Sequence, residues 1–575
     1  MRATRGTALS LILLLVAALL AYHNSFSGDF VFDDESYIVK NPSIRKLWPL
    51  WETLFAIPGE RESRPLLNLS LAFNYRLGGL NPWGYHAFNL AVHVLASFLL
   101  FFILRTALRW GPAFSISLLW LVHPLQTESV TYVIQRSESM MGLFYLAALY
   151  AFILGTTPRG RKGWLKASIL FSCLGMLAKP VMVTVPVSIL LYDRCFVTGS
   201  FFKALARRLG FYLALFSTTL LAAGLMLQAQ ARHGTGTWFT YSELTPLKYA
   251  ALQPGVILKY LKLCVWPHPL VLDYAWPLQV AREGVLIPGL ILGALFVLAL
   301  WATVAHPRVG FVGLAFFLIL APTSGFIPLP DPAFEHRMYL PLACVATLAT
   351  LAVYWALNKW AKPERRRLIL CSAFAMLPAL VLGVLTVARN LDYQSDAEIW
   401  RDTVEKRPAN ARAHYNLGFA LLHSAQYEEA AHHLKKALAL KAEYPDAHNA
   451  LGLVESGRRN PAEAMKHYRE ALSLSPRHVD ALTNMGGELS RTGRFSEAEE
   501  YLRKALEANP AHAQAYNNLG NVYFEQGRLK EAAGYYREAL ALDPALEEAG
   551  RNLGQVLLMS GHGGAASEST TFGDR

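Results

Sequence analysis

Three adjacent acidic residues follow the first apolar stretch of the chain. Asp33, Asp34 and Glu35 stand in the segment GDFVFDDESYIVKNP, shortly after an apolar run at residues 8–22. A carboxylate in such a place can accept a proton from a hydroxyl group during a transfer reaction. The alternative is structural, because acidic residues also cap helices and form polar turns.

Basic residues, histidines and further acids recur beside the ends of later apolar runs. Ionisable groups at membrane depth are costly and tend to line cavities. Because Arg, Lys and His can hold a phosphate leaving group, charges of both signs suit a reaction between a polar acceptor and an anionic lipid. Each could instead be a paired structural charge, which we expect for His93 on its apolar helix. The set comprises Arg64, His86, His123, Glu128, Arg136, Lys179 and the run Glu335-His336-Arg337.

The composition of the chain is that of a polytopic membrane protein. Its 575 residues are 53% hydrophobic and 17% charged, with a mean hydropathy of +0.26. Such sparse charge excludes an ordinary soluble globular chain and a disordered one. The five cysteines lie in or beside apolar segments and do not form a recognisable set of metal ligands.

Eleven segments approach the roughly 20 apolar residues that a helix needs to cross a bilayer. Segment 250–264 holds Lys259 and Lys262, so we expect it to lie at the membrane interface instead. The first segment could be a cleaved signal peptide, but it lacks a clear cleavage site and we expect an uncleaved signal anchor. The eleven segments are approximately 8–22, 87–107, 113–123, 138–156, 164–178, 180–193, 210–228, 285–305, 310–321, 338–357 and 368–388.

The distribution of basic residues predicts the orientation of these segments. With a cytoplasmic N-terminus, 18 Lys and Arg residues fall on the cytoplasmic connections, whereas the three short connections on the opposite face hold Arg136, Lys179 and Arg337. An odd number of crossings then places the C-terminal part on the outer face, together with residues 23–86. The basic excess thus serves membrane orientation, and we expect no nucleic-acid partner.

A composition break near residue 389 separates this region from a soluble one. Residues 389–575 hold 22 Lys and Arg against 26 Asp and Glu, a net charge of −4, which leaves +16 for residues 1–388. The second part has a repeat of 34 residues, the tetratricopeptide pattern, in which paired helices cross closely at small residues. The glycines that mark the repeat are Gly418, Gly452, Gly486, Gly520 and Gly554.

We therefore predict an all-α protein with two domains and a tail. Residues 1–388 form a polytopic membrane helical domain, and residues 389–559 form an α-solenoid of tetratricopeptide repeats that starts with a half unit at Trp400 and Pro408. Residues 560–575 are expected to be disordered. Such arrays usually present a concave surface to a peptide or protein, although a spacer without its own ligand is the alternative. Residues that could line this surface are His414, Asn416, His448, Asn449, Asn517 and Asn518.

The order of the motifs resembles that of the transmembrane and tetratricopeptide repeat-containing proteins, proposed protein O-mannosyltransferases with the C-type polytopic glycosyltransferase fold. The resemblance extends over nearly the whole chain, in the succession FVFDDESYIVKNP, RPLLNLSLAFNYRLGGLNPWGYHAFNLAVH, HPLQTESVTYVIQRSE, AKPVMVTVP and FEHRMYLP before the repeats. It implies transfer of a hexose, mannose in eukaryotic members, from a polyprenyl phosphate carrier in the membrane to Ser or Thr of an acceptor protein. The site would face the lumen of the endoplasmic reticulum, or the extracytoplasmic side of a bacterial inner membrane.

The resemblance also implies roles for single residues. The paired acids of the family match Asp33 and Asp34, with Asp33 as the base. The family motif ERYLYLP reads EHRMYLP here, so the place of its arginine falls to His336 or to Arg337, of which we prefer Arg337. Further matches to family motifs are Tyr85, His86, His123, Glu128 and Arg136.

A single displacement with inversion is the mechanism that the resemblance suggests. Asp33 would deprotonate the acceptor hydroxyl, and Arg337, Lys179 or Arg136 would hold the lipid phosphate. A divalent cation near Asp34 is compatible with this mechanism and is not required by it.

Two other functions are compatible with the sequence. The chain could be a non-catalytic membrane scaffold that recruits envelope proteins through its repeats, or a transporter whose charges line the path of a lipid-linked sugar. An enzyme should lose activity in Asp33→Asn while partner binding is kept. A scaffold should lose its function only when the repeats change, and a transporter should move substrate without a covalent product.

Overall fold

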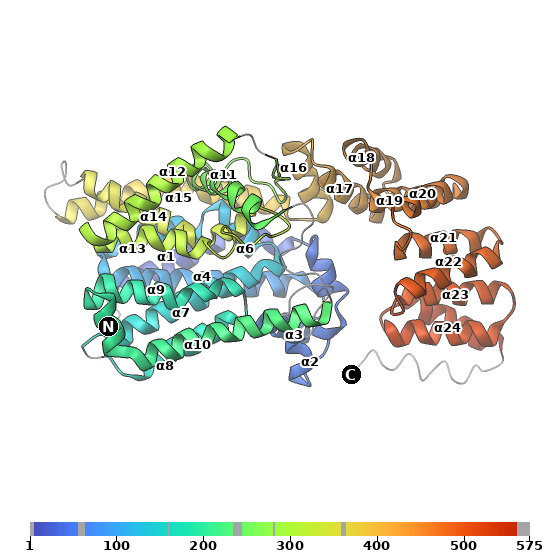
Figure 1. Ribbon diagram of the computed structural model, residues 1–575, viewed down its shortest axis with the longest axis horizontal. Helices are drawn as coiled ribbons and strands as arrows, with labels where there is room; N and C mark the ends of the chain where they lie inside the picture. Colours follow the sequence, from blue (N-terminus) through green and yellow to red (C-terminus); the bar gives the residue numbers. More distant parts are fainter. Residues whose placement is uncertain are drawn as a thin grey trace. The chain divides into compact units, whose positions relative to one another are not determined.

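The computed structural model describes residues 5–55, 64–158, 160–233, 244–279, 282–357 and 364–560 (Figure 1). The residues in these ranges are mostly α-helical and include no strand. The chain divides into two compact units, Met1–Asp402 and Thr403–Arg575. This division lies beyond the predicted boundary at residue 388, because the residues that follow the last apolar helix pack on the first unit. Of the predicted tail, residues 561–575 lie outside the described ranges.

The first unit contains a helix at each of the eleven predicted apolar segments. Among the described residues, seven stretches are long and apolar enough to cross a membrane, judged by length and composition, and four further apolar helices are shorter. The all-α fold with a polytopic membrane domain is thereby confirmed, while the number of crossings stays a prediction. The seven are Gly6–Ser27, Pro82–Ala107, Val133–Thr156, Pro180–Thr198, Phe201–Leu225, Arg282–Ala305 and Leu368–Asp392, and the shorter four are Trp110–Leu121, Gly163–Met176, Pro307–Leu320 and Pro341–Ala356.

Further helices connect the apolar ones, and several candidate site residues lie in them or directly before them. The helices at the apolar segments, together with α11, are α1 (Arg5–Tyr22), α4 (Pro82–Ala107), α5 (Trp110–Leu121), α7 (Arg136–Thr156), α8 (Gly163–Met176), α9 (Val185–Tyr192), α10 (Phe201–His233), α11 (Pro246–Val265), α12 (Arg282–Ala305), α13 (Pro307–Leu320), α14 (Pro341–Ala356) and α15 (Glu364–Asp392). The connecting helices are η1 (His23–Ser27), η2 (Glu35–Val39), η3 (Pro42–Ile44), α2 (Leu50–Leu54), α3 (Pro65–Gly78), η4 (Pro124–Gln126), α6 (Thr127–Val130), η5 (Val133–Gln135), η6 (Pro180–Thr184), η7 (Asp193–Thr198) and η8 (Glu335–Met338).

The apolar helices of this unit run side by side in Figure 1. Helix α7 packs between α4 and α8, and α5 packs against α15. Many Leu, Ile and Val side chains on the outer faces of α1, α12 and α15 are exposed. Apolar surface of this kind is expected where a helix faces lipid, since lipid tails are as apolar as leucine.

The ends of the first and last apolar helices lie together. Asn390 Nδ2, near the end of α15, donates to the carbonyl oxygen of Ala21 at 2.9 Å and to Asn24 Oδ1 at 3.0 Å. Asn24 Nδ2 in turn donates to the carbonyl oxygen of Val387 at 2.9 Å. Helices α1 and α15 therefore end at the same end of the bundle, so the acidic segment and the residues that lead to the repeats emerge beside each other.

Helix α11 differs from the helices around it. It covers the segment that we expected at the membrane interface, and it is not among the candidate spans. Its buried residues recur every three or four positions, from Tyr249 through Val256 and Tyr260 to Leu263, which is the pattern of a helix that buries one face. Its interfacial position stays a prediction.

The second unit consists of paired helices in the tetratricopeptide arrangement. Helix α16 (Asp396–Lys406) spans the division between the units, and up to residue 560, where the description ends, four pairs and a last single helix follow it. Within each pair the two helices pack against each other along their length. The pairs are α17 (Ala411–His423) with α18 (Tyr427–Leu440), α19 (Pro445–Gly457) with α20 (Pro461–Leu474), α21 (Val479–Arg491) with α22 (Phe495–Ala508) and α23 (Ala513–Glu525) with α24 (Leu529–Leu542), before α25 (Glu547–Met559).

The repeated glycine marks the place where the two helices of a pair approach most closely. A Cβ added to Gly452 would lie 2.3 Å from the ring of Tyr468, and one added to Gly520 would lie 2.4 Å from that of Tyr536. Around Gly554 there is open space instead, because no partner helix follows α25 among the described residues. The glycine period thus reports helix pairing, and the fourth pair is the last complete one in the part of the chain that the structure describes.

Candidate active site

Asp34 is a buried anchor of the acidic segment. Its carboxylate accepts the main-chain N–H of Val31 at 3.1 Å and that of Ile134 at 2.7 Å, and its side chain is fully buried. Burial raises the pKa of Asp34 to about 8, although the two main-chain donors act in the opposite direction. Each oxygen of Asp34 thus accepts one main-chain N–H, and a divalent cation near this residue stays a prediction.

Asp33 is held by an unusual backbone conformation at the residue before it. Phe32 has a φ of 50°, in the left-handed region that side chains disfavour. Its N–H donates to Asp396 Oδ1 at 2.7 Å, and its ring meets that of Trp400 edge-on. Such strain persists only where the surroundings impose it, and it is concentrated at functional sites. Asp33 itself is half-buried, so it is the acid of this pair that reaches the surface.

Tyr132 connects the acidic segment to the next group of ionisable residues. Its hydroxyl oxygen accepts the main-chain N–H of Asp33 at 3.0 Å. Burial and then the negative charges of Asp33, Asp34 and Glu128 raise the pKa of Tyr132 well above its usual value. The phenol therefore lies beside the main chain of Asp33.

Glu128 and His336 form a buried pair. Glu128 Oε2 accepts the main-chain N–H of His336 at 2.8 Å, and Oε1 lies 2.7 Å from His336 Nδ1. Burial raises the pKa of Glu128 to about 7. The pKa of His336 is held well below its usual value by burial and by the positive charges of Lys179, Arg337 and Arg64. Both directions favour a neutral His336 that donates from Nδ1 to Glu128.

Lys179 and Arg64 are the basic residues of this group with direct side-chain partners on α7. Lys179 forms an ion pair with Glu138, and both side chains are largely buried. Burial lowers the pKa of Lys179, which the charge of Glu138 counteracts. Arg64 is half-buried, and its Nη1 donates to Ser137 Oγ at 3.3 Å. These two cations therefore lie over neighbouring residues at the start of α7.

Arg337 is surrounded by main-chain acceptors. Its Nη1 donates to the carbonyl oxygen of Pro332 at 2.6 Å and to that of Thr323 at 3.2 Å, and its Nη2 donates to that of Asp331 at 2.6 Å. A further bond of 3.2 Å reaches the hydroxyl of Tyr249. These contacts hold the connection before η8 in place, so the geometry gives Arg337 a structural task.

Arg136 also donates hydrogen bonds to oxygen atoms of the protein, and its side chain is completely buried. Its Nη1 donates to Asn74 Oδ1 at 2.5 Å and its Nη2 to the carbonyl oxygen of Tyr85 at 3.1 Å. The guanidinium also lies over the ring of Phe88, 4.8 Å from its centroid. Arg136 thus joins α3 and α4 to α7.

The candidate histidines outside η8 are bonded within the fold. His86 Nε2 lies 3.1 Å from the carbonyl oxygen of Gly28, which ties the acidic segment to α4. His123 accepts the N–H of Leu125 and so caps η4, and its Nε2 lies 3.1 Å from the carbonyl oxygen of Cys264. His93 contacts Tyr339 and Leu121 in the same manner, as expected for a paired core histidine.

Glu335 and Arg389 complete the group, and sequence reasoning gave Arg389 no role. Glu335 Oε1 accepts bonds of 2.7 Å from the N–H of Val271 and from the hydroxyl of Tyr274, while burial raises its pKa to about 7. Arg389 pairs with Asp392 and Asp402 through Nη1. Its Nε and Nη2 are buried without a partner among the described residues. An arginine at the end of an apolar helix looks like an ordinary interfacial anchor, so nothing local indicated this position.

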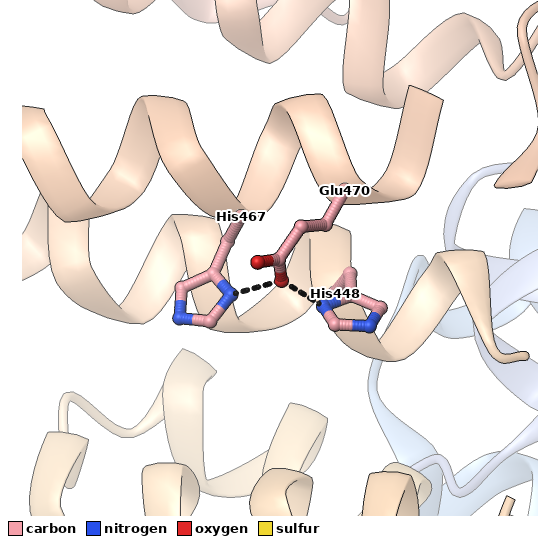
Figure 2. Close-up of side chains that lie close together, drawn as sticks. All are labelled: His448, His467 and Glu470. Carbon is pink, nitrogen blue, oxygen red and sulfur yellow. Dashed lines mark ion pairs between the residues drawn. The ribbon is translucent and has the colours of Figure 1, made fainter. Parts of the chain in front are cut away.

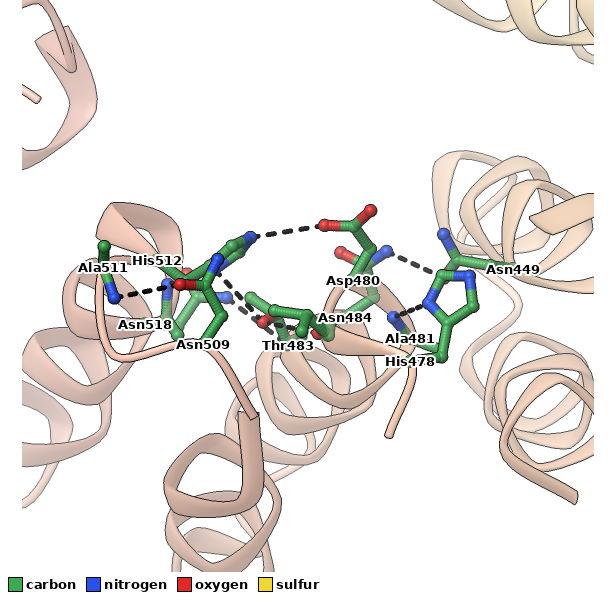
Figure 3. Close-up of polar contacts among 12 residues, drawn as sticks. Asn449, His478, Asp480, Ala481, Thr483, Asn484, Asn509, Ala511, His512 and Asn518 are labelled. Atoms are coloured by element: carbon green, nitrogen blue, oxygen red, sulfur yellow. Dashed lines mark hydrogen bonds and ion pairs between the residues drawn. The ribbon is translucent and has the colours of Figure 1, made fainter. Parts of the chain in front are cut away.

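Polar side chains of the repeat unit connect neighbouring repeats. His478 Nε2 lies 3.1 Å from Asp446 Oδ1, and 34 residues later His512 Nε2 lies 3.2 Å from Asp480 Oδ1 (Figure 3). In the same view Asn484 Nδ2 points to Asn449 Oδ1 at 2.9 Å. These contacts join α19, α21 and α23 along one face of the solenoid.

A groove of about 650 Å³ lies in the repeat unit. Helices α19, α21, α23 and α25 all contribute to its lining, which contains more acidic than basic side chains. Of the residues expected to line a binding surface, Asn518 does so, whereas Asn517 is buried and bonded to Asn552. The groove has the size and polarity to receive a polar peptide segment. Its charged and amide residues are Asn484, Glu488, Arg491, Asn518, Asn521, Glu525 and Glu548.

The repeat unit and the whole chain both resemble known proteins. Residues 420–479 and 483–547 match the tetratricopeptide repeat family. The chain is 24% identical to protein O-mannosyl-transferase TMTC3 of Mus musculus, over 77% of this chain and 52% of that protein. It is 27% identical to TMTC4 of Homo sapiens, over 70% and 62%, and 27% identical to TMTC1 of Homo sapiens, over 76% and 56%. Both proteins are also named protein O-mannosyl-transferases.

These matches confirm the resemblance that the motifs indicated. The chain spans between 52% and 62% of the length of these three relatives. Among solved structures, YrrB, a tetratricopeptide repeat protein with an unusual peptide-binding site, is 24% identical, with a TM-score of 0.23 over 30% of this chain and 88% of that one.

Proposed function

We propose that this chain is an integral membrane glycosyltransferase that moves a hexose, in the first instance mannose, from a polyprenyl-phosphate carrier to Ser or Thr hydroxyls of proteins. The names of the relatives that cover most of this chain support O-mannosyl transfer. The observation that carries the proposal is the position of Asp33. It is half-buried beside the left-handed Phe32, next to the fully buried anchor Asp34.

Asp33 acts as the general base. Its carboxylate takes the proton of the acceptor hydroxyl while the hydroxyl oxygen attacks the anomeric carbon of the sugar. The bond between that carbon and the phosphate oxygen breaks in the same step, and its electron pair leaves with the carrier phosphate. One displacement of this kind inverts the anomeric configuration, and no sugar is bound covalently to the protein.

The carrier phosphate is held by Lys179 and Arg64. The charge that develops on the leaving phosphate needs cations that are in place before the reaction. Arg64 is half-buried, and Lys179 pairs with the carboxylate of Glu138. In contrast, the guanidinium groups of Arg337 and Arg136 donate hydrogen bonds to carbonyl and amide oxygens of the protein. We therefore assign Arg337 and Arg136 to positioning, and phosphate binding to the other two.

The site and the repeats occupy the same aqueous compartment, opposite the cytosol. The excess of basic residues on the alternate connections supports this orientation. The bonds between Asn390 and the end of α1 support it independently, because they bring the ends of α1 and α15 together. Topology reporters placed after residue 27 and after residue 392 should give the same extracytoplasmic or luminal signal.

The acceptor protein is bound by the groove of the repeat unit. Its amide side chains, among them Asn484 and Asn518, can bond to the main chain of an extended segment. Its excess of acidic groups favours an acceptor with basic residues near the modified hydroxyl.

The decisive experiment compares Asp33→Asn with Glu35→Gln in membranes supplied with lipid-linked mannose and an acceptor protein. An amide in place of the Asp33 carboxylate cannot accept the proton, so transfer should fall about 100-fold or more. Glu35 is exposed and pairs with Lys40, so its variant is the matched control and should retain transfer. Turnover that is unchanged in Asp33→Asn at equal expression would remove the assignment.

The alternative function is a scaffold that recruits envelope proteins without catalysis. The groove favours protein binding under either proposal. A scaffold would keep its function in Asp33→Asn and lose it when groove residues such as Asn484 and Asn518 are changed. The enzyme would instead lose transfer to a small acceptor in Asp33→Asn and retain it in the groove variants.

A further inference from the structure

The second repeat contains a cluster of metal-ligating side chains away from the membrane unit. His448 lies on α19, and His467 and Glu470 lie on its partner α20 (Figure 2). Among the described residues, these three form a group of His, Cys, Asp or Glu side chains that could hold a metal ion, one ligand atom from each lying within 4.8 Å of the others. His467 and Glu470 are three residues apart and therefore share a face of their helix.

The distances within the cluster suit a transition metal. His448 Nδ1 lies 2.9 Å from Glu470 Oε2, and His467 Nδ1 lies 3.4 Å from the same oxygen. Ligands of a tetrahedral zinc ion, with bonds of about 2.0–2.1 Å, stand about 3.4 Å apart. Two imidazoles and a carboxylate can therefore surround an ion after small side-chain movements. Three protein ligands leave a fourth position for water.

The positions of His448, His467 and Glu470 can be compared with the corresponding positions in the other three repeats. Of the four repeats, the second has a metal-ligating side chain at all three. His414 and His433 occupy the first two positions 34 residues earlier, with their Nδ1 atoms 3.0 Å apart. Lys436 stands there where the second repeat has Glu470. His414 Nε2 also lies 3.1 Å from the carbonyl oxygen of Pro408. Both ring nitrogens of His414 therefore have a hydrogen-bond partner, namely Pro408 and the ring of His433. The third and fourth repeats carry Leu482 with Tyr501 and Tyr516 with Tyr535 at these positions.

We infer that His448, His467 and Glu470 bind a divalent transition metal ion, with Zn²⁺ the best match, which joins the two helices of the second repeat. Mixed imidazole and carboxylate ligands suit Zn²⁺ and its neighbours in the first transition row, and they are a poor set for Mg²⁺ or Ca²⁺. The ion would stabilise α19 against α20 at the edge of the solenoid. This site is independent of the transfer reaction proposed for the membrane unit.

Metal titration of the full chain tests this inference. The protein is purified in detergent without a histidine tag, treated with a chelator and titrated with Zn²⁺ by calorimetry and with Co²⁺ by visible absorption. The wild type should bind one equivalent that is missing from Glu470→Gln and from His467→Gln. His433→Gln is the matched control from the first repeat, and it should retain that equivalent. A Co²⁺ absorption band that is lost in the same two variants would identify the ligands.

A gain-of-site variant keeps the test decisive if a loss variant folds poorly. Lys436→Glu places the missing carboxylate beside His414 and His433, and it should add a second equivalent of Zn²⁺. Zn²⁺ should also raise the melting temperature of the wild type and leave that of Glu470→Gln unchanged. Equal stoichiometry in wild type, Glu470→Gln and Lys436→Glu would overturn the inference and leave the cluster as an ion pair of histidines with Glu470.

Discussion

The main-chain N–H of Phe32 donates to Asp396 Oδ1 at 2.7 Å, across 364 residues of sequence. This bond fastens the left-handed residue before Asp33 to the first turn of α16. Such a conformation costs about 1–3 kcal/mol at a residue other than glycine, and the bond is one of the contacts that hold it. The position of the proposed base therefore depends on the segment that leads into the repeats.

Asp396 should make the stability of this connection dependent on pH. Burial, and then the negative charges of Glu35, Asp29 and Asp33, raise the pKa of Asp396 to about 6. The folded chain then binds more protons at this group than the unfolded chain between about pH 4 and pH 6. The stabilising contribution of Asp396 to the free energy of unfolding is thus fully present below about pH 4, and it is lost as the pH rises from about 4 to about 6.

Asp396→Asn keeps the acceptor oxygen and removes the titration. Melting temperatures of the full chain in detergent at pH 4.5 and pH 7 should differ more for the wild type than for this variant. Other carboxylates titrate in both proteins, so the comparison isolates Asp396. Equal pH dependence in the two proteins would contradict the raised pKa.

Asp34→Asn should act through folding, unlike Asp33→Asn. The amide presents one NH₂ group to the N–H of Val31 or of Ile134, which leaves a buried donor without an acceptor at a cost of about 1–3 kcal/mol. We expect a lower melting temperature and a proportionate loss of transfer, whereas Asp33→Asn should lose transfer at an unchanged melting temperature. An Asp34→Asn protein that melts like the wild type but is inactive would give Asp34 a chemical role.

A double variant separates the structural from the catalytic part of Lys179. Lys179→Ala leaves Glu138 as a buried charge without its partner, which costs about 3–5 kcal/mol. Adding Glu138→Gln should restore most of the lost stability, because the amide carries no charge. Transfer should stay low in the double variant, since the cation for the carrier phosphate is still absent. Recovery of both stability and transfer would reduce Lys179 to a structural role.

The repeat glycines allow a test with an internal control. Gly520→Ala places a methyl group 2.4 Å from the ring of Tyr536, and overpacking of this kind costs about 1–3 kcal/mol. Gly554→Ala meets open space and should be neutral, or stabilising by up to about 1 kcal/mol through helix propensity. Thermal or urea unfolding of the two variants should show this contrast, and equal effects would mean that the fourth pair is not packed as described.

The elements of this fold were predictable from the sequence because their signals are local. A long run of apolar residues predicts a helix without reference to its neighbours, and each of the eleven predicted segments has one. A 34-residue period likewise repeats one helix pair, so Gly418 to Gly520 marked the packing in advance. The resemblance to protein O-mannosyltransferases rested on short motifs in a fixed order, which can also be read along the chain.

The roles within the candidate site depend on partners that are distant in sequence. Adjacent acids looked equivalent until Ile134, 100 residues away, was found to bond Asp34 and not Asp33. Arg337 and Lys179 were both candidate phosphate ligands, but carbonyl oxygens surround only the guanidinium of Arg337. Most hydrogen-bond donors and acceptors in a buried site are satisfied, and which groups satisfy them is decided by how the helices pack. The sequence by itself determined the helices and the residue types at their ends. The tertiary structure decided which main-chain and side-chain groups those residues bond to, because these partners are brought together only when the helices pack.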